Sequence, residues 1–333
     1  MKKLIFIVIL IVSLGGMSWY VYQERLFPGT SSTHSHTVFF VNPGGPAYTN
    51  FFNGVEDRLL KELHHGEGLN IYKSDAEGNP EKLKNMISEA VQAKPDIIIT
   101  ISSQPTQQAL KESDGQIPIL SALGDPVEHG YVDSLKESGT NLSGVAQQNI
   151  SLTPKRLELL KELIPTVKKV AVFYDTTCGP TKKARPIANE LAPKIGLELT
   201  EFALTNPSRG ELEEALKKIT KKDYDALIFY PHGTLFSKAD LFLTRAKEEG
   251  LPIIMPNEES LAEGAIASYG PSYYEMGRMT ARLAEKILTD KIDIKSLPFE
   301  QPSVIDFYVS LSSAESLGIT ISPEIANKAK LVK

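Results

Sequence analysis

The sequence contains only one cysteine, Cys178, among its 333 residues. A lone thiol cannot form an intramolecular disulfide, and a metal site built from several cysteines is excluded. The six histidines show no spacing typical of metal binding, and no nucleophile motif lies near them. We therefore predict no metal, no cofactor and no catalytic residue, and we interpret Cys178 as an inert thiol.

The chain also lacks an excess of positive charge. Its formal net charge is -5, and no dense stripe of lysine and arginine is present. Phosphate backbones are bound by basic surfaces, so we predict no nucleic-acid partner. The glycine-containing stretch NPGGP at 42–46 carries neither the GxGxxG dinucleotide fingerprint nor the lysine of a phosphate-binding loop. The missing motifs disfavour an α/β enzyme of the cell envelope.

Long hydrophobic runs are absent except at the start of the chain. Residues 4–22, LIFIVILIVSLGGMSWYVY, follow the basic opening MKK and contain no charged residue. A run of roughly twenty apolar residues can span a membrane, and lysines kept in the cytoplasm place the rest of the chain outside. A cleaved signal peptide and a retained anchor both fit this segment. We predict a periplasmic or extracytoplasmic protein in which residues 1–36 form the targeting segment and a linker.

From residue 37 onward, short apolar runs alternate with segments of helical apolar spacing. Strands are predicted at 37–42, 69–75, 95–102 and 117–123, and helices at 47–65, 80–94 and 104–113. The alternation starts again after residue 150, with further strands predicted at 168–175, 197–204, 224–231 and 251–256. Such a pattern is typical of parallel βαβ units. We predict an α/β protein with two doubly wound lobes, whose ligand binds beyond the carboxyl ends of the strands.

Polar residues follow the predicted strand at 95–102. Ser102, Ser103, Gln104 and Thr106 lie where this strand gives way to a helix. Their side chains, together with the free N–H groups of the helix end, could hold a carboxylate. Simple capping of the helix is the alternative interpretation.

Several stretches, in a consistent order from about residue 38 to 331, resemble one protein family. The family is that of the ABC transporter substrate-binding proteins of the tryptophan-binding-like type. The stretches that carry the resemblance are GDPVEHGYVDSL (124–135), GTNLSGVA (139–146), RLELLKELIPTVKKVAVFYD (156–175), IASYGPSYYEMGRMTARLAEKIL (266–288), LPFEQPS (297–303) and LSSAESLGITI (311–321).

The resemblance implies a type I periplasmic-binding fold, with two lobes that are joined by three crossovers and close on a small ligand. We expect residues 37–149 with 272–304 to form lobe 1, and residues 150–271 with 305–333 to form lobe 2. Gly270 would be a hinge residue together with Pro271. Relatives with assigned ligands bind amino acids, often aromatic ones. The chain is therefore expected to be a monomer that captures an aromatic or branched amino acid and delivers it to an ABC permease in the inner membrane.

The ends of the predicted strands, placed at the cleft of this fold, indicate the site residues. Asp125 would lie at the cleft rim, held extended by Pro126, where its carboxylate could pair with the ammonium of an amino acid. The alternative is an Asp-Pro turn in which the side chain of Asp125 only caps a following helix, VEHGYVDSL at 127–135. We expect the first loop and the facing lobe to contribute Asn42, Tyr48, Asp175, Thr176, Thr177, Pro231, His232, Asn257 and Glu258.

One further function stays open at this point. A membrane-anchored module that senses a ligand and reports it to a membrane partner would use the same two lobes and the same N-terminal segment. A retained anchor favours this alternative, whereas the chain encodes no cytoplasmic signalling domain.

Overall fold

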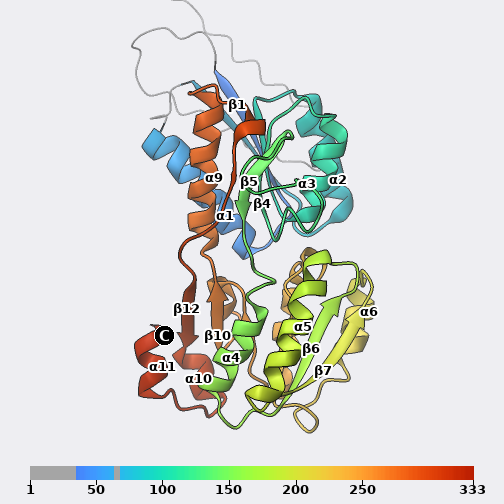
Figure 1. Cartoon of the computed structure of the whole chain (residues 1–333), viewed down its shortest axis with the longest axis vertical. Coiled ribbons are helices and arrows are strands. Elements are labelled where there is room, and N and C mark those ends of the chain that lie inside the picture. The colour runs from blue at the N-terminus through green and yellow to red at the C-terminus, as the bar shows by residue number, and fades with distance from the viewer. Residues whose placement is uncertain (1–34, 64–67) are drawn as a thin grey trace, which may run out of the picture.

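The computed structural model describes residues 35–63 and 68–333. The predicted membrane segment at 4–22 lies outside these residues. Among the residues that the structure does describe, no helix is both long and apolar enough to cross a membrane. Figure 1 shows two α/β lobes, one above the other, which are joined by extended segments of chain.

Lobe 1 is built on a six-stranded sheet with the strand order β11-β5-β4-β3-β1-β2. All neighbouring strands in it are parallel. Its strands are β1 (His36–Asn42), β2 (Leu69–Asp75), β3 (Ile97–Ile101), β4 (Ile119–Leu123), β5 (Leu142–Ala146) and β11 (Phe299–Glu300).

Helices cover both faces of this sheet, because the side chains of β1 alternate between two hydrophobic clusters. Val38 and Phe40 pack with α1 and α9 on one face, whereas Phe39 and Val41 pack with α2 and α3 on the other. Both faces of a central parallel strand must be covered in this way. The helical elements of lobe 1 are α1 (Pro46–Glu56), the π-helix η1 (Asp57–Leu63), α2 (Pro80–Gln92), α3 (Ser103–Ser113), α9 (Tyr273–Leu288) and the short η3 (Ile294–Ser296).

Lobe 2 contains a three-stranded sheet, β7-β6-β8, and a four-stranded sheet, β13-β12-β10-β9. An isolated parallel bridge between Leu227 and Ile253 connects the two sheets. The pair β10–β12 is antiparallel, unlike the expected all-parallel sheet, because β10 leads the chain out of lobe 2 and β12 leads it back. The strands of lobe 2 are β6 (Lys169–Asp175), β7 (Glu198–Leu204), β8 (Ala226–Phe229), β9 (Ile254–Met255), β10 (Ala267–Gly270), β12 (Asp306–Ser310) and β13 (Lys330–Val332).

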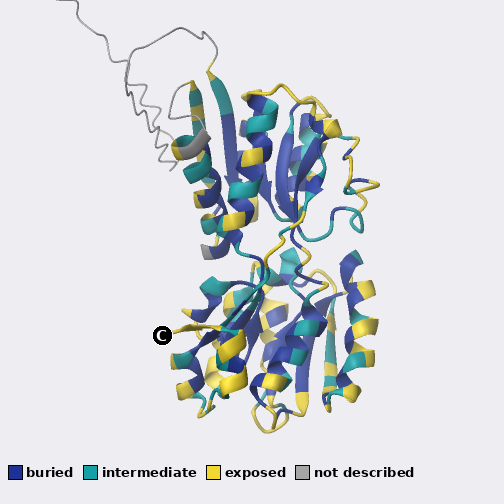
Figure 2. Cartoon of the chain, turned by 60° about the vertical axis from the view of Figure 1, so that its left-hand side comes forward, coloured by how far each residue is buried: buried dark blue, intermediate teal, exposed yellow. Residues whose placement is uncertain are grey.

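The core of lobe 2 repeats the alternation seen in lobe 1. In β6, Val170 and Val172 pack with α4 and α5, and Ala171 and Phe173 pack with α6 and α8. Figure 2 shows the central strands of both lobes buried, with exposed residues on the outer faces of the helices. The helical elements of lobe 2 are α4 (Thr153–Leu163), α5 (Gly179–Lys194), α6 (Arg209–Leu216), α7 (Gly233–Phe236), α8 (Ala239–Glu249), η2 (Glu258–Leu261), α10 (Leu311–Ser316) and α11 (Pro323–Lys328).

Three segments connect the lobes. They run from β5 to α4, from β10 to α9 and from β11 to β12. We propose the lobe boundaries expected from the sequence, since the expected changes of lobe at 149–150, 271–272 and 304–305 fall within these three segments. The ends of the strands that face the opposite lobe then form the walls of one cleft.

Candidate functional site

A cavity of about 180 Å³ lies between the lobes. Lobe 1 lines it with the loop and helix start at 44–48, and lobe 2 lines it with residues from α7, α8 and η2. Binding sites for drug-sized molecules are commonly larger, at about 300–1,000 Å³. The cavity therefore suits a small metabolite.

Aromatic rings from both lobes, Tyr48 and Phe236, line one wall of this cavity, and the ring of Tyr273 lies next to them. Tyr48 of α1 lies 5.7 Å from Phe236 of α7, measured between ring centroids, and Phe236 lies 6.0 Å from Tyr273 of α9. Burial raises the pKa of Tyr48 well above its usual value, against a hydrogen bond with Ser102 that lowers it. The tyrosine is thus uncharged at physiological pH, and the wall offers an apolar, flat surface.

The two lobes give the cavity opposite polarity. On the lobe 1 side, α1 begins without a side-chain cap and without an acidic residue in its first turn. The N–H groups of this turn therefore present the positive end of the helix dipole. On the lobe 2 side the cavity is lined by Asp240 and Glu263. Partial burial of the carboxyl group, followed by the neighbouring Asp240 and Glu259, raises the pKa of Glu263.

Asn42 holds the loop that lines the cavity. Its side-chain amide donates to Asp75 Oδ2 at 2.8 Å and to Thr49 Oγ1 at 3.3 Å, while its Oδ1 accepts from the amide of Gly44 at 2.9 Å. These internal hydrogen bonds fix the chain between β1 and α1. They indicate a positioning role for Asn42, and its expected contact with the ligand stays a prediction.

The residues at the start of α3 lie partly near the cleft and partly in the core of lobe 1. Ser102 lies near the cleft with a positive φ of 71°, a strained conformation for a residue other than glycine, and forms no side-chain cap for α3. Ser103 and Gln104 follow it, and Gln104 is exposed. Thr106 is fully buried instead.

The Thr106 hydroxyl is used within the core of lobe 1. It lies 2.8 Å from Thr100 Oγ1, 2.7 Å from Ser121 Oγ and 2.7 Å from the carbonyl oxygen of Ser102. Three protein groups lie within hydrogen-bond distance of its hydroxyl, which indicates a role in the core, and the expected ligand contact of Thr106 stays a prediction.

Asp125 lies in a turn and not before a helix. Its Oδ1 accepts a hydrogen bond from the backbone amide of Glu128 at 3.1 Å, and residues 126–130 form the turn. Of the two interpretations left open by the sequence, this geometry favours the capping role. The carboxylate is only half-buried, and one of its oxygens is committed to the turn.

Across the cleft from Asp125, Asp175 organises the end of β6 in lobe 2. It is fully buried, and its Oδ1 accepts from the Thr177 amide at 2.9 Å, the Thr177 hydroxyl at 2.7 Å and the Asn206 amide at 3.2 Å. Burial acts to raise its pKa, but these hydrogen bonds together hold the pKa below the usual value. Thr176 is exposed, and its hydroxyl lies 2.8 Å from that of Thr205.

The loop after β9 contains Asn257 and the acidic pair Glu258 and Glu259, and these three residues have different contacts in the structure. Asn257 is buried and lines the cavity, as the sequence led us to expect for this loop. Glu258 forms a hydrogen bond with Tyr308, whereas the neighbouring Glu259 accepts from Asn50 Nδ2 of lobe 1 at 2.8 Å. Glu259 therefore joins the lobes, and no feature of the sequence distinguished it from Glu258.

A second set of contacts joins the lobes elsewhere in the cleft. Glu128 of lobe 1 forms an ion pair with Lys183 of lobe 2. The rings of His129 and His232 stack across the cleft with centroids 5.9 Å apart. Pro231, directly before His232, is half-buried.

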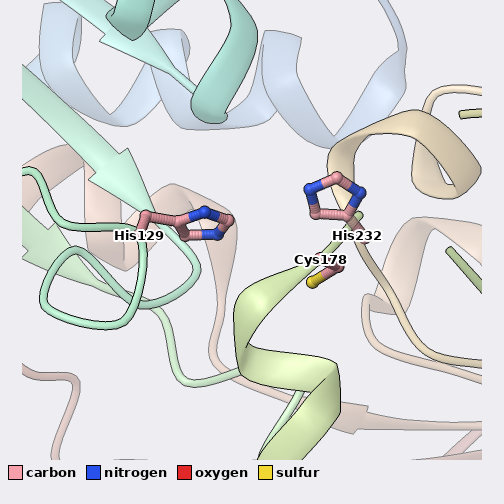
Figure 3. A group of neighbouring side chains, drawn as sticks. All are labelled: His129, Cys178 and His232. Carbon is pink, nitrogen blue, oxygen red and sulfur yellow. The ribbon is translucent and has the colours of Figure 1, made fainter. Parts of the chain in front are cut away.

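Cys178 lies beside the two stacked histidines. The possible ligand atoms of His129, Cys178 and His232 all lie within 4.8 Å of one another, as Figure 3 illustrates. No local sequence pattern predicted this group, because its members are far apart along the chain. Folding brings together the ends of three strands from two lobes.

The crossovers are fastened by one buried cation, Arg156 of α4. Its Nη1 donates to the Asn149 carbonyl oxygen at 2.6 Å, and its Nε donates to the Tyr269 carbonyl oxygen at 2.8 Å. Burial lowers the pKa of Arg156 to about 9, which leaves the guanidinium charged at neutral pH. The predicted hinge residues Gly270 and Pro271 follow Tyr269 directly, so this arginine ties the first and second crossovers together.

Comparison with known proteins agrees with this architecture. Residues 39–333 match the family model described as ABC transporter substrate binding protein. The chain belongs to this family. It is thus a substrate-binding protein and not an enzyme, and substrate-binding proteins of ABC transporters act outside the cytoplasm.

Among its relatives is the tyrosine-binding protein of Clostridioides difficile (strain R20291), which is 30% identical over 290 residues, or 84% of this chain and 81% of the relative. A Streptococcus pneumonia ABC domain in complex with L-Trp superposes with a TM-score of 0.78 at 23% identity, covering 91% of this chain and 100% of that one. The ligand-free, open structure of an adhesive Clostridium difficile substrate binding protein gives a TM-score of 0.62 at 25% identity, covering 90% and 99% of the two chains. The fold is the type I periplasmic-binding fold.

Proposed function

We propose that the cleft captures one free amino acid with an aromatic or branched side chain and delivers it to an ABC importer. The observation that carries the proposal is the cavity between the lobes, which combines an aromatic wall with oppositely polarised sides. A zwitterion with an apolar side chain matches this combination. The tyrosine-binding relative, at 30% identity, supports the same ligand class.

The proposed pose follows from the polarity of the cavity. The side chain of the ligand packs against Tyr48 and Phe236, which belong to different lobes. The carboxylate lies at the start of α1, where uncapped N–H groups favour an anion. The ammonium lies on the side of Glu263 and Asp240, the two carboxylates that line the cavity from lobe 2.

This pose moves the ammonium contact from Asp125 to Glu263. Asp125 is half-buried in a turn that it caps, whereas Glu263 lines the cavity itself. Asp240 is also near the cavity, but it is paired with Arg209. Glu263 is therefore the carboxylate that we assign to the ammonium.

Lobe closure couples binding to transport in this proposal. The ligand touches both lobes, so it favours the closed arrangement by its difference in affinity for the closed and open states. Contacts such as Asn50 with Glu259 then add to that preference. We further propose that residues 4–22 direct the chain to the envelope or tether it there, and that a monomer meets the permease.

A thermal-shift panel of amino acids, sugars and nucleosides on the full chain tests the proposal. A ligand at a hundredfold its dissociation constant adds about 2.7 kcal/mol to the free energy of unfolding, which raises the melting temperature by several degrees. We expect a shift from tyrosine, tryptophan, phenylalanine or a branched amino acid.

Two charge-neutralising variants form a matched pair for this panel. Glu263→Gln should reduce the shift strongly, whereas Asp125→Asn should leave most of it intact. A shift produced only by a sugar or a nucleoside would overturn the ligand class. Loss of the amino-acid response in Asp125→Asn alone would restore the original assignment of the ammonium contact to Asp125.

A further inference from the structure

We propose that His129, Cys178 and His232 form a binding site for a transition-metal ion that accepts mixed nitrogen and sulfur ligands, with Zn²⁺ as the reference ion. The site bridges the lobes. It lies apart from the residues that line the cavity, and it does not rest on the proposed amino-acid ligand.

The geometry of the three side chains is the first argument. His129 comes from the turn after β4 in lobe 1, while Cys178 precedes α5 and His232 precedes α7 in lobe 2. Figure 3 shows His129 reaching across toward Cys178 and His232. Their possible ligand atoms lie within 4.8 Å of one another. Two imidazoles and one thiolate are a ligand set that Zn²⁺ uses with a fourth, open position.

A buried carboxylate behind His232 is the second, independent argument. Asp175 is fully buried, and among the described residues its Oδ2 has no hydrogen-bond partner. This oxygen lies 3.6 Å from His232 Nδ1, which likewise has no hydrogen-bond partner among the described residues. Metal-binding histidines commonly donate their second ring N–H to a carboxylate, which fixes the tautomer and orients the ring. With Nδ1 facing Asp175, Nε2 of His232 is the nitrogen left for the ion.

Metal binding requires the neutral form of each imidazole and the thiolate form of the cysteine. Cys178 is buried as a thiol and would lose its proton to the solvent when the sulfur binds the ion.

The site should also couple metal binding to the position of the lobes. In a tetrahedral zinc site with Zn–N near 2.0–2.1 Å and Zn–S near 2.3 Å, the ligand atoms lie roughly 3.5 Å apart. Atoms separated by up to 4.8 Å must then approach one another further. Because His129 belongs to the opposite lobe, this approach would draw the two walls of the cleft together.

The test is a titration of the full chain, freed of metal by a chelator, with Co²⁺ and then with Zn²⁺. We expect one Co²⁺ per chain with a thiolate-to-cobalt charge-transfer absorption, and displacement of Co²⁺ by one Zn²⁺. Cys178→Ser should abolish the charge-transfer band, and His129→Ala should weaken Zn²⁺ binding although it alters only lobe 1. Asp175→Asn should weaken Zn²⁺ binding by about 10–100-fold.

His36→Ala is the matched control, since His36 lies in β1 near Asp96 and outside the cluster. It should bind Zn²⁺ as the unaltered chain does. The proposal is overturned if Co²⁺ binds without a thiolate band, if His129→Ala binds Zn²⁺ with unchanged affinity, or if no ion binds. Far-UV circular dichroism checks that each variant is folded. Because the metal alone is the probe, failure here leaves the amino-acid panel untouched, and the reverse also holds.

Discussion

The guanidinium of Arg156 donates a hydrogen bond of 2.6 Å to the backbone carbonyl oxygen of Asn149. Arg156 belongs to α4 of lobe 2, and Asn149 lies on the first crossover. A further hydrogen bond from the same side chain reaches the carbonyl of Tyr269, at the start of the second crossover. One buried cation thus holds together two of the three segments that connect the lobes.

Replacing this arginine should destabilise the protein. Arg156→Lys keeps a positive charge but cannot reach both carbonyl groups with a planar fork. Leaving buried acceptors without partners costs about 1–3 kcal/mol each. We expect the free energy of unfolding to fall by about 2–3 kcal/mol in urea denaturation.

Arg282→Lys is the comparison, because Arg282 forms an ion pair with Glu300 at the surface. Exposed pairs contribute about 0–1 kcal/mol, so this variant should stay close to the parent. Equal losses in the two variants would show that Arg156 does not fasten the crossovers.

Gly270 should tolerate no side chain. A Cβ atom at this position would lie 2.0 Å from the Pro256 carbonyl oxygen and 3.1 Å from Asn149 Oδ1. Gly270→Ala must displace the backbone at the hinge, and we expect a loss of about 1–3 kcal/mol, measured as a lower urea midpoint. Gly210→Ala, in α6 with no described atom within 4 Å of the added carbon, should be neutral or stabilising. A stable Gly270→Ala variant would contradict the close packing of the crossovers.

The Thr106 hydroxyl should matter for stability and not for ligand binding. Thr106→Val removes a group that lies within hydrogen-bond distance of both Thr100 and Ser121 in the core. We expect a loss of about 1–3 kcal/mol in the free energy of unfolding with an unchanged dissociation constant for the ligand. The exposed Thr176→Val serves as its control for stability. Weaker ligand binding in a folded Thr106→Val protein would instead support the contact between Thr106 and the ligand that is expected from the sequence.

Glu201 should contribute to stability in a pH-dependent way. A hydrogen bond from Arg185 lowers the pKa of Glu201, although burial opposes this effect. A carboxyl group whose pKa is depressed in the folded state stabilises the protein above its unfolded pKa of roughly 4.3. That contribution disappears as the pH falls through the lower, folded pKa.

The measurement is urea unfolding of the parent and of Glu201→Gln at neutral pH and at acid pH. The parent should lose more stability on acidification than the variant does. Glu190→Gln is the control, because its partner Lys194 and Glu190 itself are largely exposed and solvent screens their interaction. The same acid loss in parent and Glu201→Gln would contradict the assignment.

The sequence pattern predicted the strands more accurately than the helices and turns around them. The alternating pattern placed β2 at 69–75 with both ends correct. It failed where tertiary contacts decide the structure. One expected helix at 47–65 divides into α1 and η1, and the segment at 126–130 forms a turn. Strand β5 was not predicted, because its burial between β4 and β11 is provided by distant parts of the chain.

The sequence indicated the region of the cavity better than it indicated the individual residues that line the cavity. The rule that ligands bind beyond strand ends pointed to Tyr48 and Asn257, and both line the cavity. It could not tell side chains that face the cleft from those that serve the core, as the buried Thr106 demonstrates. Phe236 and Glu263 were missed because they do not follow a strand directly: Phe236 ends α7, and Glu263 lies after η2. The approach of His129 to Cys178 and His232 depends on how the two lobes meet, which no local pattern encodes.

The central claim is that one ligand packs against the aromatic wall to which Tyr48 of lobe 1 and Phe236 of lobe 2 both contribute. It is tested most directly by calorimetric titration of the full chain with the best amino acid from the panel. Tyr48→Ala and Phe236→Ala should each raise the dissociation constant at least tenfold, whereas Tyr131→Ala, outside the cavity, should leave it nearly unchanged. An unchanged dissociation constant in either folded cavity variant would contradict the account, because the ligand would then not be held by both lobes at this place.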